Sequence, residues 1–273
     1  MGNLTVRRLL VDLDTPLPRH WCGDAFRTAF YNALSMSFPA GEQLFIDSVR
    51  QALAALPPDR RAAFDEEVQG FIGQEATHRR VHERFNALLA QQGLVNHWEP
   101  RILARRPVLQ ALDLRNWLAV TAATEHLTAL FAQHLLTHAS ALQGAPPRLR
   151  DLWLWHCSEE AEHRSTAFDL YVASGGAASW RIGIFKVVTR QFIVDTLRQT
   201  LRNLWADGSW WRPGTWTEAA RFLFGREGLI RCTRAGWREY LREEFHPAQA
   251  DGALATAWLA DHAALAPPVR AAA

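Results

Sequence analysis

Cysteine is scarce in this sequence, and its three copies lie far apart. Cys22, Cys157 and Cys232 are odd in number and form no CxxC pair. This spacing argues against a disulfide scaffold and against a thiolate zinc site, and it fits a reducing cytosol. Lysine is scarcer still, because Lys186 is the only one and arginine carries nearly all of the positive charge.

Long apolar runs and an excess of charge of one sign are also missing. The longest uncharged stretch, residues 126–147, contains three histidines and a Gly-Ala-Pro-Pro turn, which disqualify it as a membrane-spanning helix. The N-terminal apolar run is short and is followed by Asp12 and Asp14, unlike a signal peptide. With 30 basic and 28 acidic residues, the net charge of +2 gives no case for nucleic-acid binding. We therefore expect a globular protein located in the cytoplasm.

The residue pattern predicts helix nearly throughout the chain. Ala, Leu, Arg, Glu and Gln dominate, and long alternating β-patterns are absent. Residues 95–107 are expected to be a connection because they contain Pro100 and Pro107. Pro39 and Gly41 are expected to separate the first two helices. The predicted helices cover residues 25–34, 42–56, 59–92, 108–142, 148–174, 180–205, 217–224, 227–243 and 248–263.

Four of these helices have the connectivity of a known bundle. Two short joints and one longer crossover, at residues 95–107, link them, as in a ferritin-like four-helix bundle. We therefore predict an all-α fold with two domains. Residues 1–176 would form the ferritin-like bundle with an N-terminal arm, and residues 177–273 would form a helical extension, rich in Trp and Arg, packed on it.

Polar residues interrupt the apolar stripe of each long helix. The stripe residues alternate at spacings of four and three, so they share one face. The second long helix has the stripe Phe64, Val68, Phe71, Glu75, His78, His82, Phe85 and Leu89. The fourth has Leu149, Trp153, His156, Glu160, His163, Ala167 and Leu170. Because Glu42 and Glu125 occupy the same setting on the other two, each helix directs one glutamate to the interior.

Four carboxylates in one apolar interior need neutralising charge. Burying even one unpaired carboxylate costs several kcal/mol, and no Arg or Lys lies on the stripes between the glutamates. Two divalent cations would supply the missing charge. A Glu from each of two helices and a Glu-x-x-His from each of the other two is the ligand pattern of di-iron carboxylate bundles. The sequence therefore predicts a dinuclear metal site.

The predicted ligands come from all four helices. They are Glu42, Glu75, His78, Glu125, His156, Glu160 and His163. His156 is included because it precedes Glu160 by one turn. His82 and Glu159 are expected beside the ligands, where His82 would either bind metal or orient a ligand.

Other residues near these positions receive different predictions. Phe45, Phe71, Trp117 and Trp153 are expected to line the substrate pocket. Cys157 is expected to be a packing residue, and no acid or base apart from the metal ligands is predicted. His134 and His138 are expected to be structural or exposed.

Three segments carry a resemblance to a known family. GQEATHRRVHERFN, ATEHLTA and WLWHCSEEAEHRSTAFDLY resemble the bacterial family catalogued as predicted metal-dependent hydrolases, over most of the chain. The same ligand positions also resemble those of di-iron arylamine N-oxygenases, ferritin-like enzymes with four carboxylates and three histidines. The first resemblance implies a hydrolase and the second an O2-dependent enzyme.

The ligand types favour iron or manganese and leave three functions open. Carboxylate-rich, mixed oxygen and nitrogen ligation suits iron or manganese better than zinc, so two metal ions, Fe/Fe or Mn/Fe, are expected. The main prediction is an O2-dependent oxygenase or oxidase that acts on a small or lipid-like apolar substrate. Its electrons would come from an external donor, because no flavin or nicotinamide motif is present. The alternatives are a dinuclear metal-dependent hydrolase and an iron-oxidising or metal-storage protein.

Residues 180–240 have a composition that differs from the rest. They contain eleven basic and five acidic residues and six of the twelve tryptophans. Basic amphipathic helices with interfacial tryptophans can lie on anionic membranes, which would suit a lipid-like substrate. The alternative is that these helices pack against the bundle or against a second copy of the chain in a homodimer.

Overall fold

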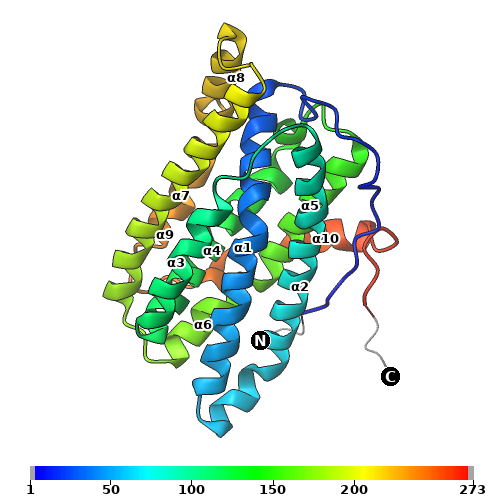
Figure 1. Cartoon of the computed structure of the whole chain (residues 1–273). Helices are drawn as coiled ribbons and strands as arrows, with labels where there is room; N and C mark the ends of the chain where they lie inside the picture. Colours follow the sequence, from blue (N-terminus) through cyan, green and yellow to red (C-terminus); the bar gives the residue numbers. More distant parts are fainter. Residues whose placement is uncertain (1–3, 270–273) are drawn as a thin grey trace.

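The structure is a computed structural model that describes residues 4–269, and four long helices form its centre. These are α1 (Ala25–Ala55), α2 (Pro58–Gln91), α4 (Leu114–Thr137) and α5 (Pro147–His163). Helix α1 packs against α2 and α4, and α4 packs against α5. Figure 1 shows α1 running through the length of the molecule. The crossover from α2 to α4 contains α3 (Glu99–Ala111).

The C-terminal part of the chain is also helical. It contains α6 (Thr166–Ala173), α7 (Ala178–Ala206), α8 (Pro213–Phe224), α9 (Leu229–Glu239) and α10 (Ala253–Asp261). The all-α fold with a helical C-terminal extension is therefore confirmed. Helix α7 packs directly against α1 and α4, while the division into two domains at residue 176 stays a prediction. Within residues 4–269, no helix combines the length and the apolar character that crossing a bilayer requires.

Helix α1 is continuous, so the prediction of two helices separated at Pro39 and Gly41 is wrong. Proline has no N–H, which leaves the carbonyl of Ser35 without its helical donor. Asn86 of α2 replaces that donor, because its Nδ2 donates to Ser35 O at 2.9 Å. Asn96 supports the next carbonyl in the same way, with Nδ2 donating to Met36 O at 2.7 Å. Side chains distant in sequence therefore allow the helix to pass through the proline.

The predicted connection at residues 95–107 is also wrong, because most of it belongs to α3. Pro100 lies in the first turn of α3, where its missing N–H costs nothing. Residues 108–111, which were expected to begin the third long helix, are the end of α3. Helix α4 begins afresh after Asp113, whose carboxylate accepts a hydrogen bond from Arg115 N at 2.9 Å.

Other boundaries differ by shorter stretches. The predicted helix 148–174 is broken after His163, where the Arg164 guanidinium donates to the carbonyl of Ala161 at 2.9 Å and to that of Pro247 at 3.1 Å. Helix α4 ends at Thr137, before the expected residue 142, and α9 is shorter than the predicted 227–243. Helix α8 begins at Pro213, before the expected residue 217.

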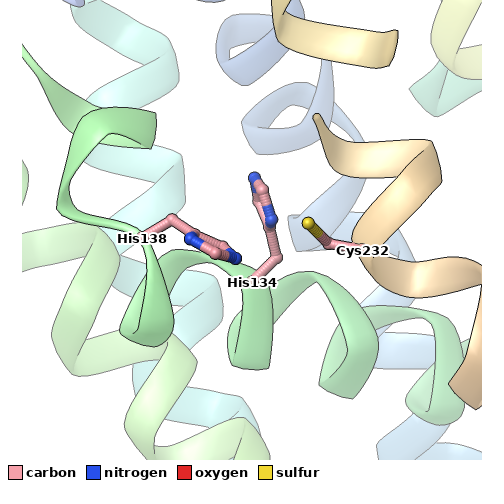
Figure 2. Close-up of side chains that lie close together, drawn as sticks. All are labelled: His134, His138 and Cys232. Carbon is pink, nitrogen blue, oxygen red and sulfur yellow. The ribbon is translucent and has the colours of Figure 1, made fainter. Parts of the chain in front are cut away.

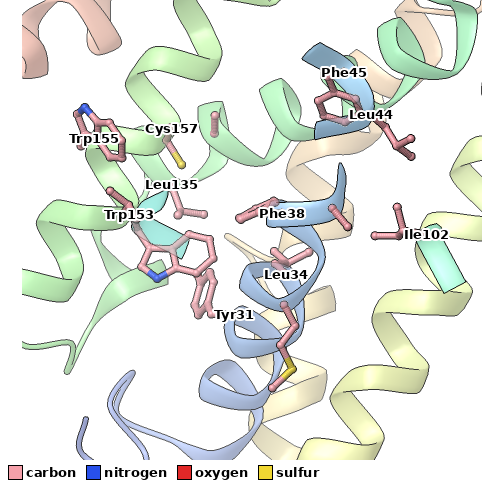
Figure 3. Packing of buried hydrophobic residues seen from close by; sticks show 14 of the residues in the cluster. Tyr31, Leu34, Phe38, Leu44, Phe45, Ile102, Leu135, Trp153, Trp155 and Cys157 are labelled. Carbon is pink, nitrogen blue, oxygen red and sulfur yellow. The ribbon is translucent and has the colours of Figure 1, made fainter. Parts of the chain in front are cut away.

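Aromatic side chains fill one end of the bundle core. Figure 3 shows Tyr31 and Trp153 packed together, with ring centroids 5.1 Å apart. Trp153 also packs against Phe38 at 6.0 Å. Cys157 is buried and free, as expected of a packing residue.

Candidate metal centre

All seven predicted ligands lie in the bundle interior. Those of α1, α2 and α4 come from the middle of a helix, whereas His156, Glu160 and His163 lie in the C-terminal half of α5, which ends at His163. The spacing of four and three places them on the buried faces. Each exposes 4% of its surface or less: Glu42, Glu75, His78, Glu125, His156, Glu160 and His163. Helices α1 and α4 each supply one glutamate, and α2 and α5 supply the Glu-x-x-His pairs.

The ligand atoms gather in two groups of three. In each group they lie within 4.8 Å of one another. The groups are Glu42, His78 and His156, and Glu75, Glu160 and His163. Glu160 joins the groups, because its Oε1 lies 3.2 Å from His156 Nε2 and 3.6 Å from His78 Nδ1. The arrangement therefore offers positions for two neighbouring cations.

Glu125 joins the second group through His163. Its Oε2 lies 3.4 Å from His163 Nε2, and Glu75 Oε1 lies 3.1 Å from the same nitrogen. Three carboxylates and one imidazole thus converge on a small region, since Glu160 Oε1 is also 3.4 Å from His163 Nε2.

Most of these atoms have no hydrogen-bond partner. Both carboxylate oxygens of Glu42, Glu75 and Glu125 are buried without one, and so are Glu160 Oε2, His78 Nδ1 and His163 Nε2. Buried polar atoms in folded proteins are nearly always satisfied, so a concentration of nine orphaned ones needs an explanation. Carboxylate oxygens with imidazole nitrogens are ligands for divalent transition metals. The donor set therefore fits a pair of such ions.

Burial and mutual repulsion distort the acid–base properties of the cluster. Burial raises the pKa of Glu42 well above its ordinary value, and neighbouring carboxylates, that of Glu75 first, raise it further. Burial likewise raises the pKa of Glu125 well above its ordinary value. Burial opposes ionisation of Glu160 as well, but contacts with His156 and His163 outweigh it and hold its pKa well below the ordinary value. The cluster is therefore electrostatically unbalanced by its own groups, and added positive charge would relieve it.

Hydrogen bonds fix the rings of His78 and His163 so that one nitrogen faces the cluster. His78 Nε2 donates to Glu159 Oε2 at 3.0 Å, which leaves Nδ1 on the side of Glu160. His163 Nδ1 donates to Gln74 Oε1 at 3.0 Å, which leaves Nε2 on the side of Glu75. Outer hydrogen bonds of this kind orient metal-binding imidazoles and set their tautomer.

Arg7 connects the outer partners of these two histidines. Its guanidinium donates to Glu159 at 3.2 Å and to both oxygens of Glu162, at 2.7 and 3.0 Å. Gln74 Nε2 donates to the same Glu162 carboxylate at 2.8 Å. A continuous path of hydrogen bonds therefore runs from one imidazole to the other. Burial raises the pKa of Glu159 to about 8, and Arg7 offsets this only in part.

A second path orients His156. Ser35 Oγ donates to Asn86 Oδ1 at 2.7 Å, so it accepts from His82 Nδ1 at 2.8 Å. His82 Nε2 must then accept from His156 Nδ1, at 2.9 Å. His156 Nε2 is left to face Glu160 at 3.2 Å. Both ring nitrogens of His82 are occupied by hydrogen bonds, so the structure places this residue as the partner of His156.

Arg7 belongs to an N-terminal arm (residues 4–24) that lies across α2. Thr5 O accepts a hydrogen bond from Gln74 Nε2 at 3.0 Å. Gly70 and Gly73 let the arm approach, because a Cβ at either would overlap Leu4 or Val6. The C-terminal segment holds the arm in a terminal clasp (residues 6–10 with 265–269), in which Arg8 N donates to Pro267 O at 3.0 Å and Val269 N to Val6 O at 2.8 Å.

An apolar cavity of about 790 Å³, including its mouth, borders the cluster at Glu42. It lies between α1, α3, α4 and α7, and its walls include Phe38, Trp98, Ile102 and Phe192. Asp195 is buried and also lines the cavity. Its carboxylate forms ion pairs with Arg105 at 2.6 Å and with Arg101 at 2.7 Å. The cavity thus gives an apolar molecule access to one side of the ligand cluster.

The four predicted pocket residues lie in different places. Phe45 and Trp117 line the cavity beside Glu42. Phe71 packs instead against the ring of His163, with centroids 4.9 Å apart, and Trp153 packs against His82 at 5.5 Å. The last two are therefore not among the residues that line the cavity.

Sequence reasoning missed several residues of the site. Arg7 and Gln74 were not identified, although Gln74 lies next to Glu75 in a helix of known face. Helix α3 supplies Ile102 and Arg105 to the cavity. The sequence predicts a connection there instead, because this stretch contains Pro100 and Pro107. For Arg7 the sequence carries no signal, since its partner Glu159 is 152 residues away.

Comparison with known proteins gives one match. A family model described as "Predicted metal-dependent hydrolase" matches residues 5–251. No curated protein and no solved structure matches the chain. This match favours the hydrolase alternative over the oxygenase that was the main prediction, and it gives no support for iron or for oxidoreductase chemistry.

Proposed function

Because the chain belongs to the family of predicted metal-dependent hydrolases, we propose that it is a hydrolase with a dinuclear metal centre in its helical bundle. The metal ligands in this proposal are Glu42, Glu75, His78, Glu125, His156, Glu160 and His163. One observation carries it, namely the nine buried donor atoms of this cluster that have no partner within the protein. Unsatisfied carboxylates in an apolar interior destabilise a fold, so their retention together points to function.

The protein's own residues would prepare the centre for hydrolysis. A pair of divalent ions activates water and stabilises negative charge that develops on a substrate oxygen. The hydrogen bonds from His78 to Glu159 and from His163 to Gln74 hold the imidazoles in the tautomer that presents a lone pair inward. Phe38 and Phe71 pack against the imidazoles of His156 and His163, and so limit access of bulk water.

The cavity at Glu42 supports a class of substrate. Most of its exposed wall is aliphatic and aromatic, and Thr121 and Thr124 are among the polar residues that line it. We propose that it takes an ester or amide with an apolar acyl or aryl part, whose reacting carbonyl lies next to Glu42. Arg105 lies at the same cavity and would favour a substrate with one anionic end.

The test is metal-dependent hydrolysis by the purified full chain. The protein is stripped with a chelator, reloaded with Mn²⁺, Zn²⁺ or Fe²⁺, and assayed with p-nitrophenyl esters of increasing acyl length and with phosphoesters. We expect activity that requires metal and increases with acyl length up to the size of the cavity. A Glu75→Gln variant is expected to lose it, while Glu83→Gln, on the exposed side of the same helix, keeps it. A metal-loaded protein that cleaves none of these bonds would contradict the proposal.

A second candidate function rests on the donor set itself. Four carboxylates with three imidazoles suit iron better than zinc, so O2-dependent oxidation of an apolar substrate with an external electron donor is the competing proposal. It predicts that the Fe²⁺-loaded protein consumes O2 and develops near-ultraviolet bands. Oxygen inertness together with esterase activity would exclude it in favour of hydrolysis.

Contact with a membrane is a further proposal for residues 180–240. Trp180, Trp205 and Trp211 are 57%, 63% and 73% exposed, in a segment with an excess of arginine. Interfacial tryptophans with basic residues favour anionic bilayers. Sedimentation with anionic and neutral liposomes at low and high salt tests this. No binding to either would leave packing against the bundle, or against a second copy, as the role of these helices.

A further inference from the structure

A second group of metal-binding side chains lies near the C-terminal end of α4. His134 lies in the last turn of α4, His138 directly follows the end of that helix, and Cys232 belongs to α9. One donor atom of each lies within 4.8 Å of the other two. Figure 2 shows the ring of His134 between His138 and the sulfur of Cys232. Nine residues, or about 13 Å of helix, separate His134 from Glu125, so this group is distinct from the bundle cluster.

The buried histidine of this group has an unmet bonding requirement. His134 is 4% exposed, and its Nδ1 is buried with no hydrogen-bond partner. A buried nitrogen without a partner is costly, and most are satisfied by protein, water or an ion. His134 adjoins a polar cavity that Ser140 and Glu227 also line. A ligand can therefore reach the side chain of His134 from solvent.

A fourth donor is held close by. Glu227, in the turn between α8 and α9, has its Oε2 4.0 Å from His138 Nδ1. The same oxygen accepts a hydrogen bond from Ser140 Oγ at 2.7 Å. The carboxylate is thus restrained beside the histidine pair.

We propose that His134, His138 and Cys232 bind one divalent transition-metal ion of the zinc class, with Glu227 completing a tetrahedral set. Two imidazoles, a thiolate and a carboxylate are ligands that zinc accepts. Bond lengths of 2.0–2.3 Å place tetrahedral donors about 3.3–3.8 Å apart. The donors here are spaced up to 4.8 Å, so closure needs a shift of about 1 Å, which the half-buried His138 and the exposed Cys232 can make by side-chain rotation.

The site would attach α9 to the bundle. Helix α9 has no fully buried side chain of its own, and it contacts the bundle through α4. An ion bound by residues of both helices would therefore stabilise this weakly anchored element. The scarcity of cysteine pairs in the sequence did not predict such a site, because it uses a single thiolate with histidines from another helix.

Thiol reactivity tests the proposal in the full-length protein. Cys22 and Cys157 are buried, whereas Cys232 is exposed, so a chromogenic disulfide reagent should react rapidly with one thiol in the native chain. We expect Zn²⁺, added in excess of the bundle site's capacity, to slow this reaction at least tenfold. The readout concerns only Cys232, so it is independent of whether the bundle cluster binds metal or hydrolyses a substrate.

Matched variants decide whether the protection is coordination. His134→Gln and His138→Gln should each abolish the slowing, and Cys232→Ser should lack the fast thiol. His97→Gln, at an exposed position outside the group, should behave like the unaltered protein. With Co²⁺, a thiolate-to-metal charge-transfer band should appear in the unaltered protein and disappear in Cys232→Ser. The proposal would be overturned if Zn²⁺ did not change the reactivity of Cys232. It would also be overturned if Zn²⁺ protected Cys232 in both histidine variants as well as in the unaltered protein.

Discussion

Glu160 has contacts that no other member of the cluster shares. Its carboxylate approaches the inward nitrogens of His78, His156 and His163, so it adjoins both groups of donors. Replacing it with alanine removes the residue common to both proposed metal positions. We expect Glu160→Ala to bind less than one equivalent of divalent metal, measured by elemental analysis after gel filtration. Glu83→Ala, at a half-exposed position on α2, serves as the control, and two retained equivalents in Glu160→Ala would disprove the ligand set.

Arg7 acts on the cluster through other residues. It is the cation that pairs with Glu159 and Glu162, and these carboxylates orient His78 and, through Gln74, His163. Loss of such outer partners typically reduces metal affinity 10–100-fold. We expect Arg7→Gln to show a reduction of that size in chelator-competition titrations, with the helical circular dichroism unchanged.

The neighbouring arginine is the matched control for this effect. Arg8 is exposed, and its contribution to the terminal clasp is made by its backbone N–H. Arg8→Gln should therefore retain full affinity. Equal losses in the two variants would mean that general charge, and not the contact with Glu159, explains the result.

From the sequence, residues whose positions repeat with the helix were correctly placed on the buried face, whereas residues outside such a repeat were missed. Glu75 and His78 interrupt an apolar stripe, and that interruption is visible in one sequence. Arg7 lies in an irregular arm, and its partners are more than 150 residues away. A contact of this kind has no local pattern, so it depends on the three-dimensional fold.

At the scale of elements, the predictions from sequence were wrong where they treated proline as the end of a helix. Pro39 and Pro107 both lie inside helices, although each removes a backbone donor and disfavours a helix interior. In α1 the cost is offset by Asn86, which donates to the carbonyl that Pro39 leaves free. That compensation comes from α2, so the continuous helix could not be inferred from residues 25–55 alone.

The same compensation predicts a stability effect for Asn86. Its side chain donates to Ser35 O and accepts from Ser35 Oγ. Asn86→Ala removes both bonds and leaves a carbonyl without a donor beside Pro39. We expect a loss of about 1–3 kcal/mol in the free energy of unfolding, measured by chemical denaturation. As a control, Glu83→Ala on the same helix should change the free energy of unfolding by less than about 0.5 kcal/mol. An equally small change for Asn86→Ala would show that water replaces the hydrogen bonds of the amide.

At the scale of the whole molecule, segments near the two ends of the described chain lie side by side (Figure 1). Backbone hydrogen bonds join Arg8 to Pro267, Leu10 to Leu265 and Val269 to Val6. Arg7 lies between these contacts, so its guanidinium is held over α2 and α5 by the C-terminal segment. The orientation of the proposed metal ligands in the centre of the bundle therefore depends on residues near both ends of the described chain.

Removal of the C-terminal segment tests this dependence. Deleting residues 263–273 takes away every backbone partner of the arm in the terminal clasp, but leaves α10, which ends at Asp261. Because Arg7 would then lose its fixed position, we expect metal affinity to fall at least tenfold, as for Arg7→Gln. Combining the deletion with Arg7→Gln should give little further loss, since both changes act through one contact. A chain that ends at Val269 keeps the clasp and should bind metal normally. If the deletion left affinity intact, the contacts of Arg148 with the carbonyls of Asp12 and Pro16 would have to be sufficient to hold the arm.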